Sequence, residues 1–129
     1  MYVDASALVA ILANEPERAE FLQAIASSET VTTSVVSLFE TSLAISALTG
    51  SCSSALSEVM RLVEAARIQI STIDAGLLPE LCITRDRYGK GSGSPARLNM
   101  GDCFSYALAK QAGVALLYKG DDFRQTDLG

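Results

Sequence analysis

The chain alternates between short apolar runs and longer segments in which apolar residues return every three or four positions. The short runs are apolar, β-branched or alternating, which is typical of strands, and they cover residues 1–3, 30–33, 67–73 and 114–118. The longer segments predict helices over residues 5–13, 37–48, 53–67, 74–88 and 100–111, with a further helix that begins at residues 15–16. Predicted strands are therefore always separated by helices.

Glycine and proline set the boundaries of these elements. Gly50 and Gly113 are predicted to end two helices, because glycine readily takes the left-handed conformation found after the last helical turn. Pro16 suits the first position of a helix, whereas Pro79 must lie in a first turn or kink its helix. Residues 89–95, Gly-Lys-Gly-Ser-Gly-Ser-Pro, are predicted to be a loop.

This order of elements predicts an α/β fold. Strands separated by helices need right-handed crossovers, which build a parallel sheet with helices on both faces. A length of 129 residues is enough for one domain with a core and too short for two. Ligands of such sheets bind beyond the carboxyl ends of the strands, so the side chains that follow each strand matter most for function.

Composition narrows the class of protein further. Apolar residues make up 49% of the chain and charged residues 19%, which is typical of a globular rather than a disordered protein. The longest apolar run, residues 7–13, is much shorter than the roughly 20 residues of a membrane helix, and no secretory signal is visible. Cys52, Cys82 and Cys103 have neither metal-binding nor disulfide spacing, and we expect buried, reduced thiols in a cytoplasmic protein.

The charged residues exclude several kinds of chemistry. There is no histidine, which excludes Ser-His and Cys-His catalysis and His-ligated zinc. The formal net charge is −5, so long-range electrostatics oppose nucleic-acid binding and any such binding must be local. Four bases that lie close together in sequence are candidate RNA phosphate contacts, with a solvated surface as the alternative. They are Arg85, Arg87, Lys90 and Arg97.

Five acidic residues lie where the predicted fold could bring them together. Asp4 follows the first strand, Asp121 and Asp122 follow the last, and Asp102 lies in the first turn of the helix before the last strand. Glu40 lies inside an apolar helix with no basic residue near it in sequence. Because an unpaired buried carboxylate is unfavourable by several kcal/mol, a metal ion or a shared proton is expected at Glu40.

Most of these acids also have a purely structural interpretation. Asp4 can cap the helix that follows it, as can Ser6, and Asp102 forms the pattern of a capping box with Asn99. The paired aspartates near the C-terminus can form a polar turn. Taken together, the acids favour Mg²⁺ or Mn²⁺, which prefer oxygen ligands and support phosphodiester hydrolysis without histidine. Spacing alone leaves both interpretations open.

Five short motifs span nearly the whole chain, at residues 1–12, 37–40, 88–91, 98–110 and 119–127. The first is Met-Tyr-Val-Asp-Ala-Ser-Ala-Leu-Val-Ala-Ile-Leu, and the fourth is Leu-Asn-Met-Gly-Asp-Cys-Phe-Ser-Tyr-Ala-Leu-Ala-Lys. In this order and spacing the motifs resemble those of PIN-domain ribonucleases, specifically the VapC-type toxins. The resemblance implies a single PIN domain over residues 1–129, with a three-layer α/β/α fold around a central parallel sheet of four to five strands.

The resemblance also implies roles for particular residues. The acids that would bind one or two Mg²⁺ or Mn²⁺ ions are Asp4, Glu40, Asp102 and Asp121. Asp122 is the less favoured alternative to Asp121, and Ser6 would support the first aspartate through a hydrogen bond. The implied activity is endonucleolytic cleavage of RNA by the toxin of a toxin–antitoxin module. The implied partners are a VapB-type antitoxin and a second copy of the chain, with no membrane.

The sequence also allows two other functions. A receiver-type signalling domain is also a parallel α/β unit of this size, with Asp74 as its candidate phosphoacceptor and Lys119 after a strand. The match is poor, because Asp4 is followed by Ala5-Ser6 and not by a second acid. A catalytically inactive PIN-like binding module would share the fold, although the intact acids argue against it.

Overall fold

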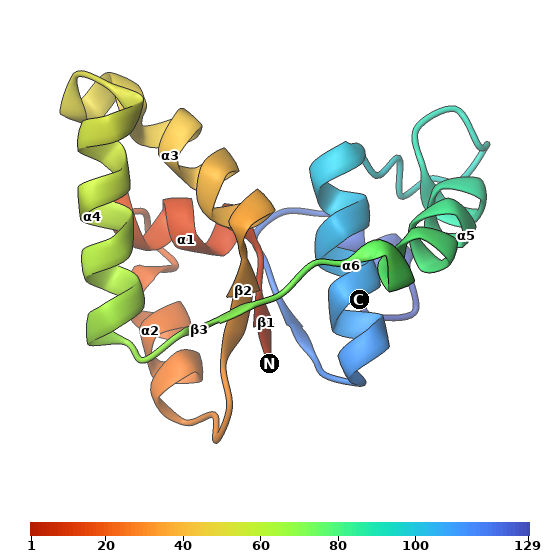
Figure 1. The fold of residues 1–129 in the computed structure, drawn as a ribbon, viewed down its shortest axis with the longest axis horizontal. Helices are drawn as coiled ribbons and strands as arrows, with labels where there is room; N and C mark the ends of the chain where they lie inside the picture. The colour runs from red at the N-terminus through yellow and green to blue at the C-terminus, as the bar shows by residue number, and fades with distance from the viewer.

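Four short parallel strands in the order β3-β2-β1-β4 form the centre of this computed structural model, which describes residues 1–129 (Figure 1). The strands are β1 (Tyr2–Val3), β2 (Thr32–Ser34), β3 (Gln69–Ser71) and β4 (Leu116–Leu117). In the register of the sheet, Tyr2 pairs with Thr32 on one side and with Leu116 on the other. The predicted parallel sheet is confirmed, and the carboxyl ends of β1 and β4 lie side by side.

Helices cover both faces of the sheet and give three layers (Figure 1). On one face lie α1 (Ala5–Leu12), α2 (Arg18–Ala26), α3 (Val35–Thr49) and α4 (Cys52–Ala65), and on the other lie α5 (Leu78–Tyr88) and α6 (Met100–Ala112). Two short 3₁₀ helices are η1 (Ala75–Leu77) and η2 (Asp122–Gln125). No single helix has the length and hydropathy to span a membrane, whereas α3 and α4 taken together, bent by 116°, meet those criteria.

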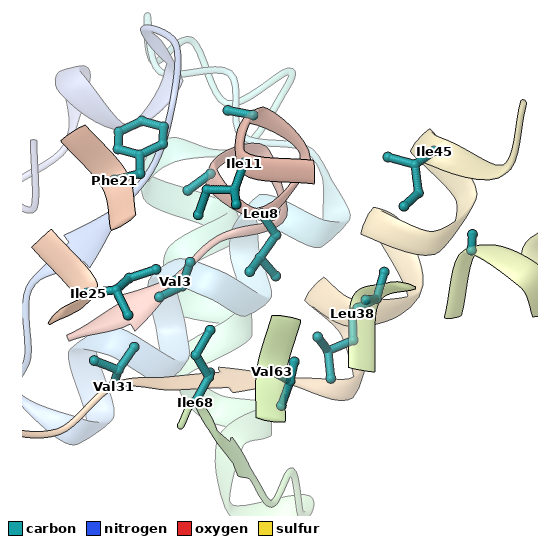
Figure 2. Packing of buried hydrophobic residues seen from close by; sticks show 14 residues of the cluster. Val3, Leu8, Ile11, Phe21, Ile25, Val31, Leu38, Ile45, Val63 and Ile68 are labelled. Carbon is teal, nitrogen blue, oxygen red and sulfur yellow. The ribbon is translucent and has the colours of Figure 1, made fainter. Parts of the chain in front are cut away.

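Each helical layer packs on its own hydrophobic core, and β1 contributes to both. Val3 belongs to a cluster of 14 buried residues between the sheet and α1–α4 (Figure 2). Tyr2 belongs to a second cluster of 12 buried residues, together with Tyr106 of α6 and Leu116 of β4. Because side chains alternate along a strand, Tyr2 and Val3 point to opposite faces. Both cores therefore fix the position of Asp4, which follows directly.

The element boundaries confirm two predicted ends and correct one predicted start. Gly50 and Gly113 have left-handed φ values of 97° and 66° and end α3 and α6, as predicted. The predicted helix start at residues 15–16 is wrong, because the Glu15 N–H still bonds to a carbonyl of α1 and α2 begins only at Arg18. Pro79 lies in the first turn of α5, after η1, which was one of its two predicted positions.

Some predictions about burial are wrong. The apolar helix predicted over residues 37–48 is expected to be buried, and Leu38 of α3 is buried, but Leu43 and Leu48 of the same helix are 51% and 71% exposed. The reason is that α3 packs on α1 and α4 with only part of its circumference. The three cysteines are free, yet only Cys103 is buried, and Cys82 of α5 is exposed.

Candidate active site

Asp4 is the most enclosed acid of the candidate site, with 4% of the residue exposed. It is the N-cap residue of α1, so the predicted capping role is real. Its Oδ2 accepts hydrogen bonds from the Ser6 backbone N–H at 2.9 Å and from the Ser6 hydroxyl at 2.6 Å. Its Oδ1 accepts a hydrogen bond from the Ser105 hydroxyl of α6 at 2.5 Å. These donors compensate the cost of placing the carboxylate away from water.

A chain of buried hydroxyl groups continues from Asp4 into the interior. The Ser105 Oγ lies 3.3 Å from the Ser37 Oγ of α3, and the Tyr2 hydroxyl lies 2.8 Å from both the Ser37 Oγ and the Ser34 Oγ. All four of these hydroxyl-bearing residues are buried. The network links α6, α3, β1 and β2 to one carboxylate. Sequence reasoning missed Ser105; the available signal was its position three residues after Asp102, on the same helix face.

Glu40 brings a second carboxylate to the site from the sixth position of α3. Its Oε1 is buried and has no hydrogen-bond partner. Burial, followed by the nearby charges of Asp4 and Asp102, raises the pKa of Glu40 to about 7. A buried, unpartnered carboxylate oxygen beside two other acids is the feature that the sequence indicated and that packing alone does not explain.

Asp102 provides the third carboxylate from the first turn of α6. It forms the predicted capping box: Asn99 Oδ1 accepts from the Asp102 N–H at 2.8 Å, and Asp102 Oδ2 accepts from the Asn99 N–H at 3.0 Å. Burial raises the pKa of Asp102 to about 6, aided by the charges of Asp4 and Asp122 and opposed by the Asn99 hydrogen bond. The other oxygen, Asp102 Oδ1, takes no part in the capping box, so Asp102 can cap α6 and still offer an oxygen to a metal ion.

The two adjacent aspartates near the C-terminus have different surroundings. The Asp121 side chain is 83% exposed and forms an ion pair with Arg124 at 3.2 Å. Asp122 is the first residue of η2, and its charge is close enough to Asp102 to raise the pKa of that carboxyl. Asp122, the less favoured of the two in sequence, is therefore the one whose charge acts on Asp102.

The four candidate bases do not form one cluster. Arg85 and Lys90 line a cleft of about 570 Å³ between α5 and the start of α6, together with Asn99 and Met100. Arg87 instead packs over the Tyr88 ring, with its guanidinium carbon 4.9 Å from the ring centroid. Arg97 and Arg87 do not line the cleft, and none of the four bases forms an ion pair.

The acids supply suitable donor chemistry for a divalent cation. Carboxylate oxygens are the ligands that Mg²⁺ and Mn²⁺ prefer, and the unpartnered Oε1 of Glu40 lacks any donor that would compete with a cation. Repulsion among Asp4, Glu40 and Asp102 would be relieved by a positive charge between them. As the side chains stand, no three of them approach closely enough to form a complete ligand set. The acids therefore have suitable chemistry for Mg²⁺ or Mn²⁺, and their binding of the ion is proposed below.

Comparison with known proteins finds relatives along the whole chain. Residues 1–128 match the family model of the PIN domain. The chain is 39% identical to a VapC ribonuclease of Rhizobium meliloti, covering 99% of each. It is 42% identical to a ribonuclease VapC of Mycolicibacterium smegmatis, covering 99% of this chain and 97% of the relative. Among solved structures, the sarcin-ricin loop cleaving toxin VapC20 of Mycobacterium tuberculosis superposes with a TM-score of 0.74 at 19% identity, covering 95% of this chain and 92% of that one.

The interpretation as a receiver-type signalling domain is wrong. The family match identifies a different domain over nearly the whole chain. Asp74, the candidate phosphoacceptor, is exposed and caps η1 by accepting a hydrogen bond from the Gly76 N–H at 2.8 Å. Lys119 forms ion pairs with Glu15 and Glu17 rather than with an acidic pocket.

Removing the Ser105 hydroxyl should destabilise the protein through Asp4. Ser105→Ala leaves one oxygen of a buried carboxylate without its donor, which is expected to lower the free energy of unfolding by about 1–3 kcal/mol. Urea unfolding measures this change. The loss should shrink in the Asp4→Asn background, where no charge needs the donor, and Ser27→Ala, at an exposed helix end, serves as the control. Equal losses in both backgrounds would contradict the role of the Ser105–Asp4 bond.

The raised pKa values of Glu40 and Asp102 predict that the metal-free protein becomes less stable as the pH rises. Glu40 and Asp102 hold protons in the folded state that the unfolded chain has already released, so unfolding releases protons. Their contribution to the free energy of unfolding should therefore decline as the pH rises from about 4 to about 7. Urea unfolding in EDTA across this range should show a shallower decline in Glu40→Gln. An unchanged slope in that variant, matching the control Glu64→Gln on α4, would refute the prediction.

Proposed function

The chain belongs to the PIN-domain family and is a ribonuclease toxin of the VapC type, and we propose that it hydrolyses RNA phosphodiester bonds at the acidic site after β1. One observation carries the proposal for the site. The buried, unpartnered Glu40 Oε1 lies with the charges of Asp4 and Asp102 at the carboxyl edge of a parallel sheet. That edge is where ligands of such sheets bind.

The proposed cofactor is Mg²⁺ or Mn²⁺, as one or two ions. The residues that would hold it are Asp4, Glu40, Asp102 and Asp122. Asp122 takes the place given to Asp121 on sequence, because Asp121 is paired with Arg124 and Asp122 acts on Asp102. When bound, the metal would lower the pKa of an attacking water and neutralise charge on the phosphate.

The side chains themselves have distinct parts in this mechanism. Asp4, held by donors on both oxygens, is a fixed negative charge. Glu40 offers an Oε1 that has no hydrogen-bond partner, and would use it to bind the cation. Its pKa of about 7 describes the metal-free protein, and a bound cation would relieve the repulsion from Asp4 and Asp102 that helps to raise it. Asp102 stays anchored through the Asn99 capping box and keeps one oxygen available.

The RNA is proposed to cross the cleft between α5 and α6. Arg85 and Lys90 line this cleft, which reaches Asn99 and Met100 just before Asp102. Both bases are without acidic partners and can supply phosphate contacts, while the cleft's apolar residues, such as Phe104, offer a surface for bases or sugars. Arg87 and Arg97 are assigned weaker, peripheral contacts, because neither lines the cleft.

Family membership also supports a cytoplasmic location and two protein partners, a VapB-type antitoxin and a second copy of the chain. Exposed apolar side chains are consistent with a surface that a protein covers. On α3, Val35, Phe39 and Leu43 recur at four-residue spacing and are 64%, 57% and 51% exposed. An inhibitor or dimer partner seated there would lie on the same helix as Glu40.

The enzymatic proposal is tested with RNA and purified protein. Wild type should cleave RNA in Mg²⁺ or Mn²⁺ and lose activity in EDTA. Glu40→Gln should reduce the rate by about 100-fold or more, since a charged ligand of the proposed metal is lost. Asp4→Asn should also lose cleavage, whereas the surface variant Glu64→Gln should retain it. If Asp4→Asn produces the same fragments as wild type, or wild type produces none, the chain is an inactive binding module or the fragments come from a contaminant.

The proposed RNA path is tested by binding in a variant that does not cleave. In the Asp4→Asn background, Arg85→Ser and Lys90→Ser should weaken binding of a fluorescent RNA, and each should reduce the slope of log affinity against log salt by roughly 0.7. The control is Arg61→Ser on α4, in the opposite layer of the sheet. Losses no larger than the control's would contradict the proposed path.

A further inference from the structure

Gly101 is a glycine in a place where the backbone does not require one. It is the second residue of α6, and its φ is not in the left-handed region that favours glycine. Within a helix, alanine is more favourable than glycine because glycine loses more backbone entropy on folding. Gly101 is also buried, so solvent exposure does not explain the glycine. A reason other than backbone conformation must therefore account for the missing side chain.

The space that a side chain would fill at Gly101 is taken by Glu40. A Cβ built on Gly101 would overlap both carboxylate oxygens and the Cδ of Glu40, and these are its nearest neighbours. Gly101 is the only glycine of the chain whose nearest atoms all belong to an acid of the proposed site. The Glu40 carboxylate thus lies directly against the backbone of α6, one residue before Asp102.

We propose that Gly101 is a positioning residue, whose missing side chain seats the Glu40 carboxylate beside Asp102 for the proposed metal-dependent reaction. The proposal rests on the proposed function for the role of Glu40. With Ser105 bonded to Asp4, three positions of one helix face then set the three acids: Gly101 admits Glu40, Asp102 is itself an acid, and Ser105 holds Asp4.

The fold is expected to survive an added methyl group at this position. The overlapping atoms are the far end of a flexible side chain, which can rotate away, and not a backbone segment. Alanine also favours the helix more than glycine does. Gly101→Ala should therefore keep or raise the melting temperature of the metal-free protein while it displaces the Glu40 carboxylate.

The test combines position, metal binding and stability. A crystal structure of metal-free Gly101→Ala should show the Glu40 carboxylate moved away from α6. Calorimetric titration should show Mn²⁺ affinity reduced by about 10-fold or more, roughly the loss of one charged ligand contact. RNA cleavage should fall in parallel. The matched control is Gly76→Ala, which adds a methyl group to an exposed glycine of η1 whose φ is also not left-handed.

A shortened acid separates positioning from general damage. Glu40→Asp withdraws the carboxylate by one methylene group and so reduces the overlap with a side chain at position 101. Glu40→Asp alone should weaken Mn²⁺ binding. Adding Gly101→Ala to that variant should lower the Mn²⁺ affinity by less than about a further 2-fold. A full additional loss in that background would mean that the effect does not pass through Glu40, and would overturn the proposal.

The remaining outcomes are equally decisive. An unmoved Glu40, or wild-type Mn²⁺ affinity in Gly101→Ala, would overturn the proposal while leaving the proposed function intact. A melting temperature well below that of Gly76→Ala would assign Gly101 a purely structural role and would also overturn it. If wild type binds no Mn²⁺ in the same titration, the proposed function fails, and the position of Glu40 in the Gly101→Ala crystal structure still decides whether Gly101 seats it.

Discussion

The burial of one carboxylate, that of Asp4, is the constraint on which the rest of the site depends. A charge with 4% exposure must be surrounded by donors, and these come from opposite faces of the sheet: Ser6 from α1 and Ser105 from α6. Ser105 in turn contacts Ser37 of α3, and the Tyr2 hydroxyl closes the chain. Satisfying one carboxylate thus fixes how the two helical layers are placed relative to β1.

The same placement brings like charges together, at a cost to the folded state. Once Asp4 is held, Glu40 and Asp102 approach it from α3 and α6, and burial with mutual repulsion raises the pKa of both. Neither Glu40 nor Asp102 has a basic partner in the structure. A fold selected for stability alone would have replaced one of them, and charged residues that oppose stability are typical of functional sites.

Local signals allowed much of the fold to be predicted, and tertiary contacts account for what could not be. Gly50 and the Asn99 capping box act within one turn of backbone, so their effects were visible in the sequence. Ser105 could not be identified in this way, because a serine inside a helix looks the same whether it faces solvent or a buried carboxylate. Asp121 and Asp122 are adjacent and chemically identical, and only the packing of η2 decides which acts on Asp102.

The electrostatics of the whole chain follow from this site as well. Without the four acids of the proposed site, the formal charge of −5 becomes −1, so most of the negative charge that opposes RNA is concentrated where we propose that RNA is cut. Arg85 and Lys90 line the cleft that reaches Asn99 and Met100, and they act only at short range. The repulsion among the acids and the repulsion of the RNA therefore have one source. A cation that relieved the first would also reduce the second, so the proposed metal binding would favour substrate binding.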